Sequence, residues 1–517
     1  MADPSVTSNQ ATTVIANRFT GDYRVDVLLE DPNFRWNAPQ PPGSPVEVTY
    51  SFAAAAPDYA AASDKNGFSV FTDSQMAAAR QAFNDIAQQF NITFKEVADT
   101  VMSYGQIRLG NNAQGATSAG YAFYPDPSLG PNAGDVYINN EDPDNLSNVI
   151  PGTNAYATIV HEIGHALGIK HPGNYNAGEP ASPAPGNFLA KSEDSEANTI
   201  MSYVKVPQAQ ERDFFGSYDI LALQYLYGSR PYNTGANAYA LGDSVGQKLQ
   251  LIIDTVGVDT LDASGATAAT TIDLREGKAS SIGRLADGAA ALNNVSIAFG
   301  TVIENAIGTS GSDTITGNST ANALTGGGGN DNIDGGAGVD TVVFSGPRSA
   351  YTAASGGALW TIADTTAGRD GTDTLTNVER LKFSDVMVAL DTGGNAGSVA
   401  KILGAVFGAS FVINKQFVGI GLSLVDGGMS YAGVMKLALD AKLGAGFTND
   451  AEVKLLYQNL LGTAPSQNDL AFWTGTISSN QFTQVSLAVM AADTSINTDN
   501  IKLTGLAATG LEYTPLA

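Results

Sequence analysis

All three histidines of the 517-residue chain fall within one short segment, TIVHEIGHALGIKHPGNYNAG. His161 and His165 are four residues apart, so on a helix they share one face with Cβ atoms about 5–6 Å apart. Gly168 can take the left-handed conformation that ends a helix, and the turn would bring His171 to the same point. Three neutral imidazoles with an open fourth position are typical of a catalytic zinc site. The segment therefore predicts Zn²⁺ bound by these three histidines.

Glu162 follows the first histidine, where its carboxylate can reach a metal-bound water rather than the metal. Zinc lowers the pKa of such a water to about 7, so a neighbouring carboxylate can accept its proton as a general base. An HExxH segment also occurs by chance on ordinary helices, and a buried helix with three incidental histidines is the alternative interpretation. The Gly–x–x–His extension and the absence of any other histidine favour the metal site.

HEIGHALGIKH matches the extended zinc motif of the metzincin metalloproteases, and NTIMSY resembles the Met-turn of that clan. Within the clan, HPGNYNAG, SEDSEANTIMSY and SYDILALQYLYG resemble the serralysins. The resemblance implies that Met201 forms an apolar floor beneath the imidazoles. It also implies that Tyr203 is an additional zinc ligand and stabilises the oxyanion. By the same resemblance, the strand that contains Ala119, Gly120 and Tyr121 binds the substrate backbone as an added strand.

A nine-residue period begins at Gly308: GTSGSDTIT, GNSTANALT, GGGGNDNID, GGAGVDTVV. Glycine holds the first position, Asp or Asn the sixth and an aliphatic residue the eighth, which matches the nonapeptide calcium repeat. If two repeats make one turn, residues 18 apart stack, and their carboxylates and backbone carbonyls form oxygen cages suited to Ca²⁺. The side of the coil that carries Asn322 should bind Ca²⁺ more weakly. The predicted calcium ligands are Gly308, Gly326, Gly335, Asp313, Asn322, Asp331 and Asp340.

A flexible glycine-rich linker is the alternative interpretation, but recurrence at three positions over four periods favours the roll. Serralysins also carry a calcium-repeat β-roll after their protease domain. By this resemblance Asp254, Gly257 and Asp259 bind a further calcium. The repeat pattern breaks at Phe344, and GRDGTDTLTNVERLKFSD resembles the β unit that caps such rolls.

Local patterns predict the elements that position these residues. Thr72 and Gln75 form a capping-box pair at the start of one helix, and Gly462 gives a stop signal after another that contains Val453. Helical spacing is absent from about residue 232 to 390 and returns from about 396. Predicted strands lie at 46–52, 105–110, 119–125 and 134–140, and predicted helices lie in the 150s and 160s and at 217–228.

The patterns together predict a multidomain chain in four parts. They are an N-terminal extension or propeptide at 1–45, an α/β metzincin zinc protease domain at 46–230, an all-β parallel β-roll with its capping unit at 231–390, and a small α-helical domain at 391–517. The helical part resembles a domain appended to many exported calcium-repeat proteins, and attachment or secretion is its predicted role.

The composition restricts the partners. A formal charge of −25 disfavours nucleic acid and anionic membranes and favours cations. Without cysteine the chain has no disulfide and no Cys-ligated metal. No N-terminal signal peptide and no run of about 18 apolar residues is visible. The resemblance implies secretion from a Gram-negative cell by type I machinery to the medium or the cell surface, although GLEYTPLA lacks the terminus associated with serralysins.

The sequence therefore predicts a secreted, monomeric zinc metalloendopeptidase that cleaves extracellular proteins or peptides and is stabilised by calcium. The alternative is a calcium-dependent surface or adhesion protein whose protease domain is autoprocessing or vestigial. The complete set of ligands and general base favours the enzyme, because a vestigial site commonly loses one of them.

Overall fold

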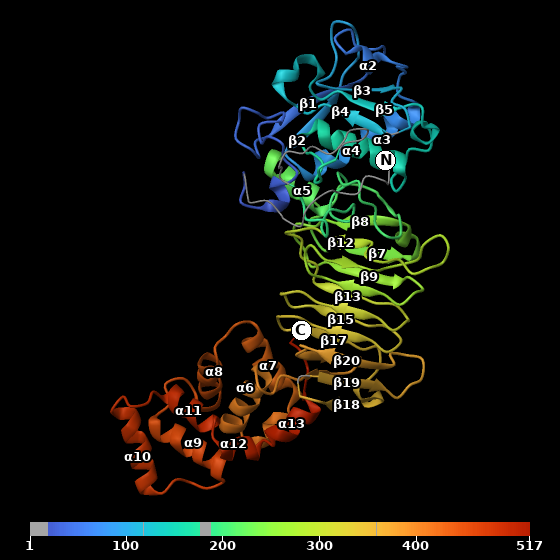
Figure 1. Cartoon of the computed structure of the whole chain (residues 1–517). Helices are drawn as coiled ribbons and strands as arrows, with labels where there is room; N and C mark the ends of the chain where they lie inside the picture. The colour runs from blue at the N-terminus through green and yellow to red at the C-terminus, as the bar shows by residue number, and fades with distance from the viewer. Residues whose placement is uncertain (1–18, 117, 176–187, 358, 517) are drawn as a thin grey trace. The chain divides into compact units, whose positions relative to one another are not determined.

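The computed structural model describes residues 19–116, 118–175, 188–357 and 359–516 (Figure 1). The chain forms two compact units: Met1–Ala268 with Leu274–Ile303, and Ala269–Asp273 with Glu304–Ala517. Part of the predicted N-terminal extension, residues 1–18, lies outside the described residues, whereas residues 19–45 are described. The four-part division expected from the sequence stays a prediction.

A five-stranded mixed sheet forms the first layer of unit one, with strand order β2-β1-β3-β5-β4. All neighbouring strands pair in parallel except β4, which lies antiparallel to β5 at the sheet edge. The strands are β1 Val46–Phe52, β2 Ile92–Glu96, β3 Ile107–Asn112, β4 Gly120–Ala122 and β5 Val136–Asn139. The four predicted strands are confirmed within a few residues at their ends.

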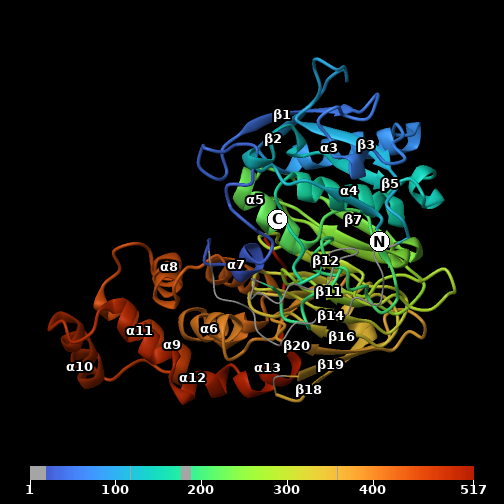
Figure 2. The same cartoon turned by 45° about the horizontal axis from the view of Figure 1, so that its top comes forward.

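Helices α3 (Asp73–Gln89) and α4 (Asn154–Ala166) pack against this sheet and against each other (Figure 2). The predicted capping box is present, since Gln75 N donates to Thr72 Oγ1 and Thr72 N donates to Gln75 Oε1. Every residue of α4 after Asn154 is buried, so this helix lies at the centre of the core. Helix α5 spans Ser217–Tyr227, as predicted. Short helices complete this part: α1 Tyr23–Asp26, α2 Ala62–Lys65, η1 Pro127–Asn132 and η2 Pro143–Leu146.

The remainder of unit one is built from short strands. Strands β11, β12, β8 and β6 form a four-stranded sheet, and β7 pairs in parallel with β9. The bounds are β6 Glu211–Arg212, β7 Ala238–Gly242, η3 Asp243–Gln247, β8 Lys248–Ile252, β9 Thr260–Gly265, β11 Ala279–Ser280 and β12 Val295–Ile297.

Unit two begins with two parallel ladders whose strands alternate along the chain. One ladder pairs β10, β14 and β16, and the other pairs β13, β15 and β17. Ile315 lies opposite Ile333, and Leu324 lies opposite Val342, so one turn of the coil takes 18 residues as predicted. The strands are β10 Thr271–Asp273, β13 Asn305–Ile307, β14 Thr314–Thr316, β15 Ala323–Thr325, β16 Asn332–Asp334 and β17 Thr341–Val343.

The coil continues past the point where the nonapeptide pattern breaks. Strand β20 (Thr372–Thr376) pairs in parallel with β16, and β21 (Arg380–Lys382) pairs in parallel with β17. The intervening residues contain η4 (Arg348–Ala350) and an antiparallel pair, β18 (Tyr351–Ser355) and β19 (Leu359–Asp364). The break at Phe344 is therefore an insertion between turns rather than the end of the coil.

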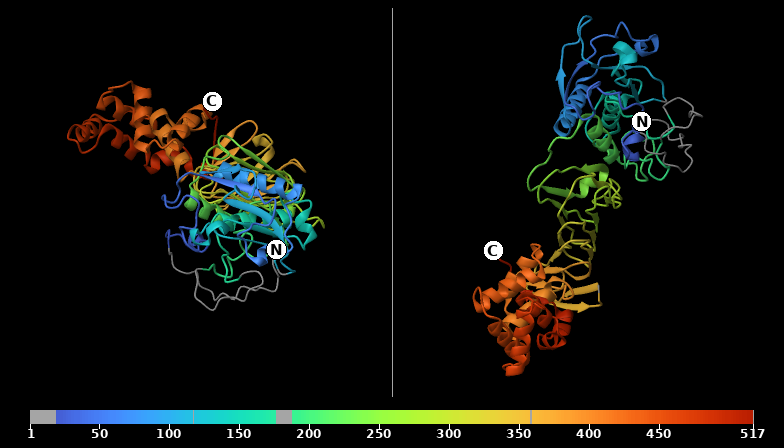
Figure 3. Two further views of the ribbon diagram at one scale, coloured as in Figure 1. Left: turned by 90° about the horizontal axis from the view of Figure 1, so that it is seen from above. Right: turned by 90° about the vertical axis from the view of Figure 1, so that its left-hand side faces the viewer.

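The helical part belongs to the same compact unit (Figure 3). After the helices, β23 (Leu511–Tyr513) returns to pair with β22 (Met387–Ala389). The helices are α6 Asn395–Ile402, α7 Lys415–Asp426, α8 Tyr431–Leu443, α9 Asn449–Leu461, α10 Gln467–Ser478, α11 Gln484–Ala492, α12 Ser495–Asn500 and α13 Leu503–Thr509, with a π-helical turn at Leu403–Phe407 and a 3₁₀ turn at Ala409–Ile413. Helix α9 ends at a left-handed Gly462, as predicted. No helix in the described ranges is long and apolar enough to cross a membrane.

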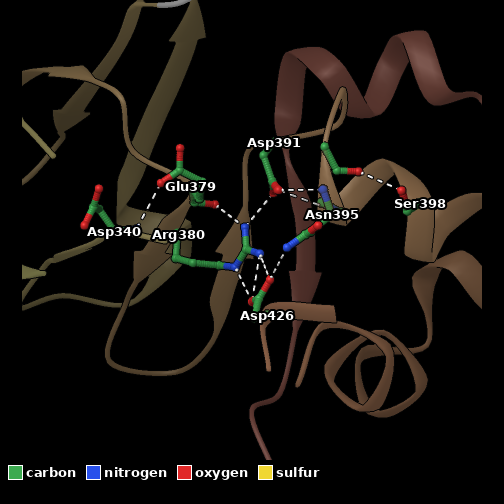
Figure 4. A network of polar contacts seen from close by, with 9 residues as sticks. Asp340, Glu379, Arg380, Asp391, Asn395, Ser398 and Asp426 are labelled. Carbon is green, nitrogen blue, oxygen red and sulfur yellow. Dashed lines mark hydrogen bonds and ion pairs between the residues drawn. The ribbon is translucent and has the colours of Figure 1, made fainter. Parts of the chain in front are cut away.

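Arg380 joins the last turn of the coil to the helices (Figure 4). Its guanidinium is 2 % exposed and donates to Asp426 on α7 at 2.7 Å and to Asp391 ahead of α6 at 2.5 Å. Glu379, the residue before it, accepts a hydrogen bond from Asp340 N at 2.9 Å. This network connects side chains of the coil directly to α7 and to the segment that leads into α6.

Candidate active site and metal centre

The structure brings the three histidines together. His161 and His165 project from α4, and His171 follows the turn at the end of that helix. The Nε2 atom of His171 lies 3.1 Å from Nε2 of both His161 and His165, and all three residues are buried. They form a group of three potential metal ligands within 4.8 Å of one another.

A backbone carbonyl fixes the orientation of each ring. Nδ1 of His161 lies 2.8 Å from Ile200 O, and Nδ1 of His165 lies 2.8 Å from Ile169 O. Nδ1 of His171 lies 3.1 Å from Tyr175 O. Because a carbonyl can only accept, each Nδ1 carries the proton and each Nε2 presents its lone pair to the shared centre. This is the tautomer that histidine uses to bind a metal through Nε2.

The electrostatics of the rings agree with this role. Burial lowers the pKa of His165 to about 4 and, with the neighbouring His165, lowers the pKa of His161 well below its usual value. Both imidazoles are therefore neutral at pH 7. Three lone pairs directed at one another in a buried site call for a cation between them, so the residues present fit a metal ion.

Glu162 lies beside the centre on α4 and is 4 % exposed. Its Oε2 has no hydrogen-bond partner within the described residues, and burial raises its pKa to about 8. The side chain packs against β4: a Cβ placed on Gly120 would lie 2.9 Å from Glu162 Cγ. Glycine at position 120 thus leaves space for the carboxylate at the metal centre.

Two glycines shape the metal-binding turn. Gly168 has φ +101°, the left-handed conformation predicted for it, and a Cβ there would collide with Phe34 O. A Cβ on Gly164 would lie 2.9 Å from Met201 Sδ. Met201 is fully buried against this part of α4, which agrees with the floor position that the resemblance implied.

Tyr203 lies next to the histidines. Its ring centroid is 4.5 Å from that of His171 and 6.0 Å from that of His161. The ring also stacks on Tyr175 at 4.8 Å, and Tyr203 N donates to the Tyr175 hydroxyl at 3.3 Å. The structure therefore brings Tyr203 to the predicted site.

Sequence reasoning missed the residues that hold the Met-turn. Asp219, at the start of α5, accepts hydrogen bonds from Thr199 Oγ1 at 2.5 Å and from Ile200 N at 2.7 Å. Asp194 accepts a hydrogen bond from the Tyr175 hydroxyl at 2.7 Å. Both carboxylates occur in segments that carried the family resemblance, but nothing in the sequence alone shows which backbone groups they reach.

Strand β4 lies at the sheet edge beside Glu162, as the substrate-strand prediction requires. Asn139 N donates to Ala119 O, and Phe123 N donates to Asp135 O, so alternate residues face β5. The backbone groups of Gly120 and Ala122 therefore point away from the sheet. The side chain of Tyr121 donates its hydroxyl to Asp64 rather than facing the edge.

The sixth-position residues of the coil stack as expected. Asp313 N donates to Asp331 Oδ1 at 2.8 Å, and Asn322 N donates to Asp340 Oδ1 at 2.7 Å. Oδ2 of Asp331 and Oδ2 of Asp340 are buried without a hydrogen-bond partner in the described residues. Burial is the main cause that raises the pKa of Asp331 to about 6 and that of Asp340 to about 7.

The glycines at the first position of the repeats lie beside these carboxylates. A Cβ on Gly308 would lie 2.6 Å from Asp313 Oδ2 and would meet Gly326 O. A Cβ on Gly335 would lie 2.8 Å from Asp340 Oδ2. A carboxylate and a carbonyl oxygen thus converge where a side chain would otherwise sit.

The third predicted calcium set, Asp254, Gly257 and Asp259, lies in unit one. A Cβ on Gly257 would lie 2.7 Å from Asp259 Oδ1, so this glycine and carboxylate adjoin. The Asp254 carboxylate accepts a hydrogen bond from the Tyr239 hydroxyl at 2.6 Å, and the charge of Asp259 acts on it.

A three-histidine centre on a buried helix, with a glutamate beside the first histidine, has the donor set of a metallopeptidase zinc site. Comparisons with known proteins agree. A family model described as metallo-peptidase family M12B reprolysin-like matches residues 128–218, and one described as peptidase M10 serralysin C terminal matches residues 219–400. Zinc is the metal that these metallopeptidase matches imply.

Curated relatives extend the comparison. The metallopeptidase AprA of Pseudomonas marginalis is 33% identical over 53% of this chain and 61% of its own length. The serralysin of Photorhabdus luminescens is 36% identical over 49% and 54%, and serralysin B of Dickeya chrysanthemi is 34% identical over 57% and 64%. The chain is a relative of the serralysins, which confirms the resemblance, and it spans less than two thirds of the length of these relatives.

Proposed function

We propose that this chain is a zinc metalloendopeptidase that acts on extracellular proteins or peptides. The observation that carries the proposal is the convergence of three Nε2 lone pairs beside a buried carboxylate, Glu162. His161, His165 and His171 would hold the zinc. When bound, zinc supplies a Lewis acid that polarises the scissile carbonyl and acidifies water.

The chain's own residues would carry the remaining steps. The Glu162 carboxylate, which the charge of a bound metal would keep ionised despite its burial, would accept the proton of the attacking water and deliver it to the leaving amine. The Tyr203 hydroxyl donates a hydrogen bond to the carbonyl oxygen as negative charge develops there. The outward backbone groups of Gly120 and Ala122 pair with the extended substrate as an added strand.

The proposal includes calcium in the coil. The unpartnered oxygens of Asp331 and Asp340, together with the glycine carbonyls, supply the hard oxygen donors that Ca²⁺ prefers. Asn322 contributes less, because its side chain carries no charge and its Oδ1 already accepts a hydrogen bond from Asn318 N at 2.8 Å. Folding that waits for extracellular calcium agrees with export by type I machinery, which we include in the proposal.

Casein hydrolysis by the zinc- and calcium-loaded chain tests the proposal, with Glu162→Gln measured beside it. Removal of the general base should lower the rate on the order of 10²–10⁴-fold while one zinc per chain is retained. Glu47→Gln, an exposed glutamate on β1, is the matched control and should leave the rate unchanged. A folded, zinc-loaded wild type as inactive as Glu162→Gln would contradict a general endopeptidase.

A further inference from the structure

Unit one contains a second pocket, separate from the three histidines. Its volume is about 430 Å³, and its walls come from α3, β8 and the segments around residues 213–215 and 232–239. Three side chains on one face of α3 line it, because Gln81, Asp85 and Gln89 are each four residues apart. None of these three residues is used by the proposed peptidase mechanism.

Two carboxylates give the pocket a net negative charge. Lys248 Nζ donates to Asp213 Oδ2 at 2.7 Å, so Asp213 is already paired. Asp85 is half-buried and makes no hydrogen bond or ion pair within the described residues. Burial raises the pKa of Asp85, and the charge of Asp213 raises it further, which shows that the two acids share one environment.

One buried polar group that lines the pocket lacks a partner, and so does a second group near the same two acids. Gln89 is 7 % exposed and lines the pocket, and its Oε1 has no hydrogen-bond partner in the described part of the chain. Tyr156 is fully buried, and its hydroxyl is likewise without a partner there. The charges of Asp85 and Asp213 both act on Tyr156, which places its ring beside the same acids. An unpaired buried acceptor of this kind destabilises the folded state unless a ligand or water satisfies it.

We propose that this pocket binds an organic cation of the guanidinium class, with Asp85 as its ion-pair partner and Gln89 Oε1 as a hydrogen-bond acceptor. A guanidinium presents five N–H donors in a planar fork, which suits a carboxylate and an amide oxygen together. The aromatic rings of Phe214, Tyr232 and Tyr239 in the wall provide faces on which such a cation rests.

A divalent metal ion fits the pocket less well. Calcium requires six to eight oxygen ligands at 2.3–2.6 Å. Within the described residues, the only group of three potential acidic or imidazole ligands is the histidine cluster. The Lys248 ammonium on Asp213 would also repel a second positive charge at that carboxylate. The remaining donors therefore suit a single, larger cation.

Calorimetric titration of the metal-loaded full chain with butylguanidinium, and separately with its neutral isostere butylurea, tests the proposal. We expect saturable one-to-one binding of butylguanidinium and at least about tenfold weaker binding of butylurea, because only the former carries the charge. Asp85→Asn should weaken butylguanidinium binding by about tenfold. It should not impair folding, since it removes a like charge beside Asp213. Gln89→Met, which keeps the volume but not the acceptor, should weaken binding on the order of fivefold.

Asp144→Asn is the matched control, because Asp144 is an exposed aspartate of the same unit away from the pocket. It should leave the affinity unchanged. Equal binding of both probes, no saturable binding, or an unchanged affinity in Asp85→Asn would overturn the proposal. A calcium titration in which Asp85→Asn removes one bound ion would overturn it too, in favour of a metal site.

Discussion

Tyr203 is held by two neighbouring rings. Its ring contacts those of His171 and Tyr175, and its backbone N–H is bonded to the Tyr175 hydroxyl. Asp194 in turn accepts a hydrogen bond from that hydroxyl. These contacts restrict the rotamers of the Tyr203 ring before any substrate arrives.

Tyr203→Phe removes only the hydroxyl of this ring and keeps the stacking. If the hydroxyl stabilises charge on the carbonyl oxygen, kcat should fall on the order of 10²-fold, as for other lost oxyanion donors. Zinc content and thermal stability should stay close to those of the wild type. Steady-state kinetics on a fluorogenic peptide measures the effect, with Tyr104→Phe as the control distant from the histidines. Full kcat in Tyr203→Phe would remove this residue from the mechanism.

The residue types at the centre were predictable, but their supporting contacts were not. The spacing of His161, His165 and His171 with Gly168 is local, so the sequence predicts both the ligands and the turn. The carbonyls that orient the rings, and the Asp219 carboxylate that holds the Met-turn, depend on how distant segments pack. No periodic pattern in the sequence predicts how these segments pack.

At the scale of elements, α9 contains a fully buried carboxyl group. Glu452 is 0 % exposed, and neither of its oxygens has a hydrogen-bond partner in the described residues. Burial alone raises its pKa to about 8. Three ion pairs on α9 and nearby elements leave Glu452 out: Lys454 with Asp450, Lys401 with Asp493, and Lys436 with Asp440. Lys442 on α8 lies over the Phe407 ring.

This carboxyl group should make the stability of unit two depend on pH. The pKa of an unfolded glutamate is about 4.3, so between about pH 4.3 and 8 the folded state holds a proton that the unfolded state has lost. The free energy of unfolding should therefore fall as the pH rises through that window and level off above it. Glu452→Gln should make this slope shallower and add about 1–3 kcal/mol at pH 8.5.

Urea unfolding followed by circular dichroism between pH 5 and 9, at constant calcium, measures this slope. Asp450→Asn, an exposed acid on the same helix, should leave the slope as it is in the wild type. Parallel pH profiles for the wild type and Glu452→Gln would show that Glu452 is not responsible.

The prediction of helices and strands succeeded where the sequence pattern was periodic, and it failed where that pattern was interrupted. Thr72, Gln75 and Gly462 fixed helix ends through local hydrogen bonds and a left-handed glycine. The continuation of the coil after Phe344 was not predicted, because the β18–β19 insertion hides the register. In the structure Asp373 accepts a hydrogen bond from Asp331 N, so it takes the next sixth position in the stack.

At the scale of the whole molecule, the coil and the helices of unit two share one network. Arg380 connects the last turn of the coil to α6 and α7, and Glu379 beside it bonds to Asp340 N. Asp340 is also a proposed calcium ligand. Calcium binding and the packing of the helical part should therefore be coupled through a chain of adjacent residues.

Titration of calcium into the zinc-loaded, calcium-depleted chain should raise the unfolding temperature of unit two. A site at 1,000 times its Kd adds about 4 kcal/mol, because the ion binds only the folded coil. Asp331→Asn should lower this gain, whereas Asp499→Asn, an exposed acid of the same unit, should not. Differential scanning calorimetry measures both. Unfolding that is indifferent to calcium would contradict the proposed cages.

The pairing of β23 with β22 has a consequence for biosynthesis. Residues 511–513 follow every helix of unit two in the chain, so the ribosome makes them after all the strands they join. Until they emerge, β22 presents an open edge of the kind on which other chains can assemble. A chain interrupted before residue 511 would keep that open edge. Chaperones and proteases, rather than the fold itself, would then have to keep such fragments from aggregating.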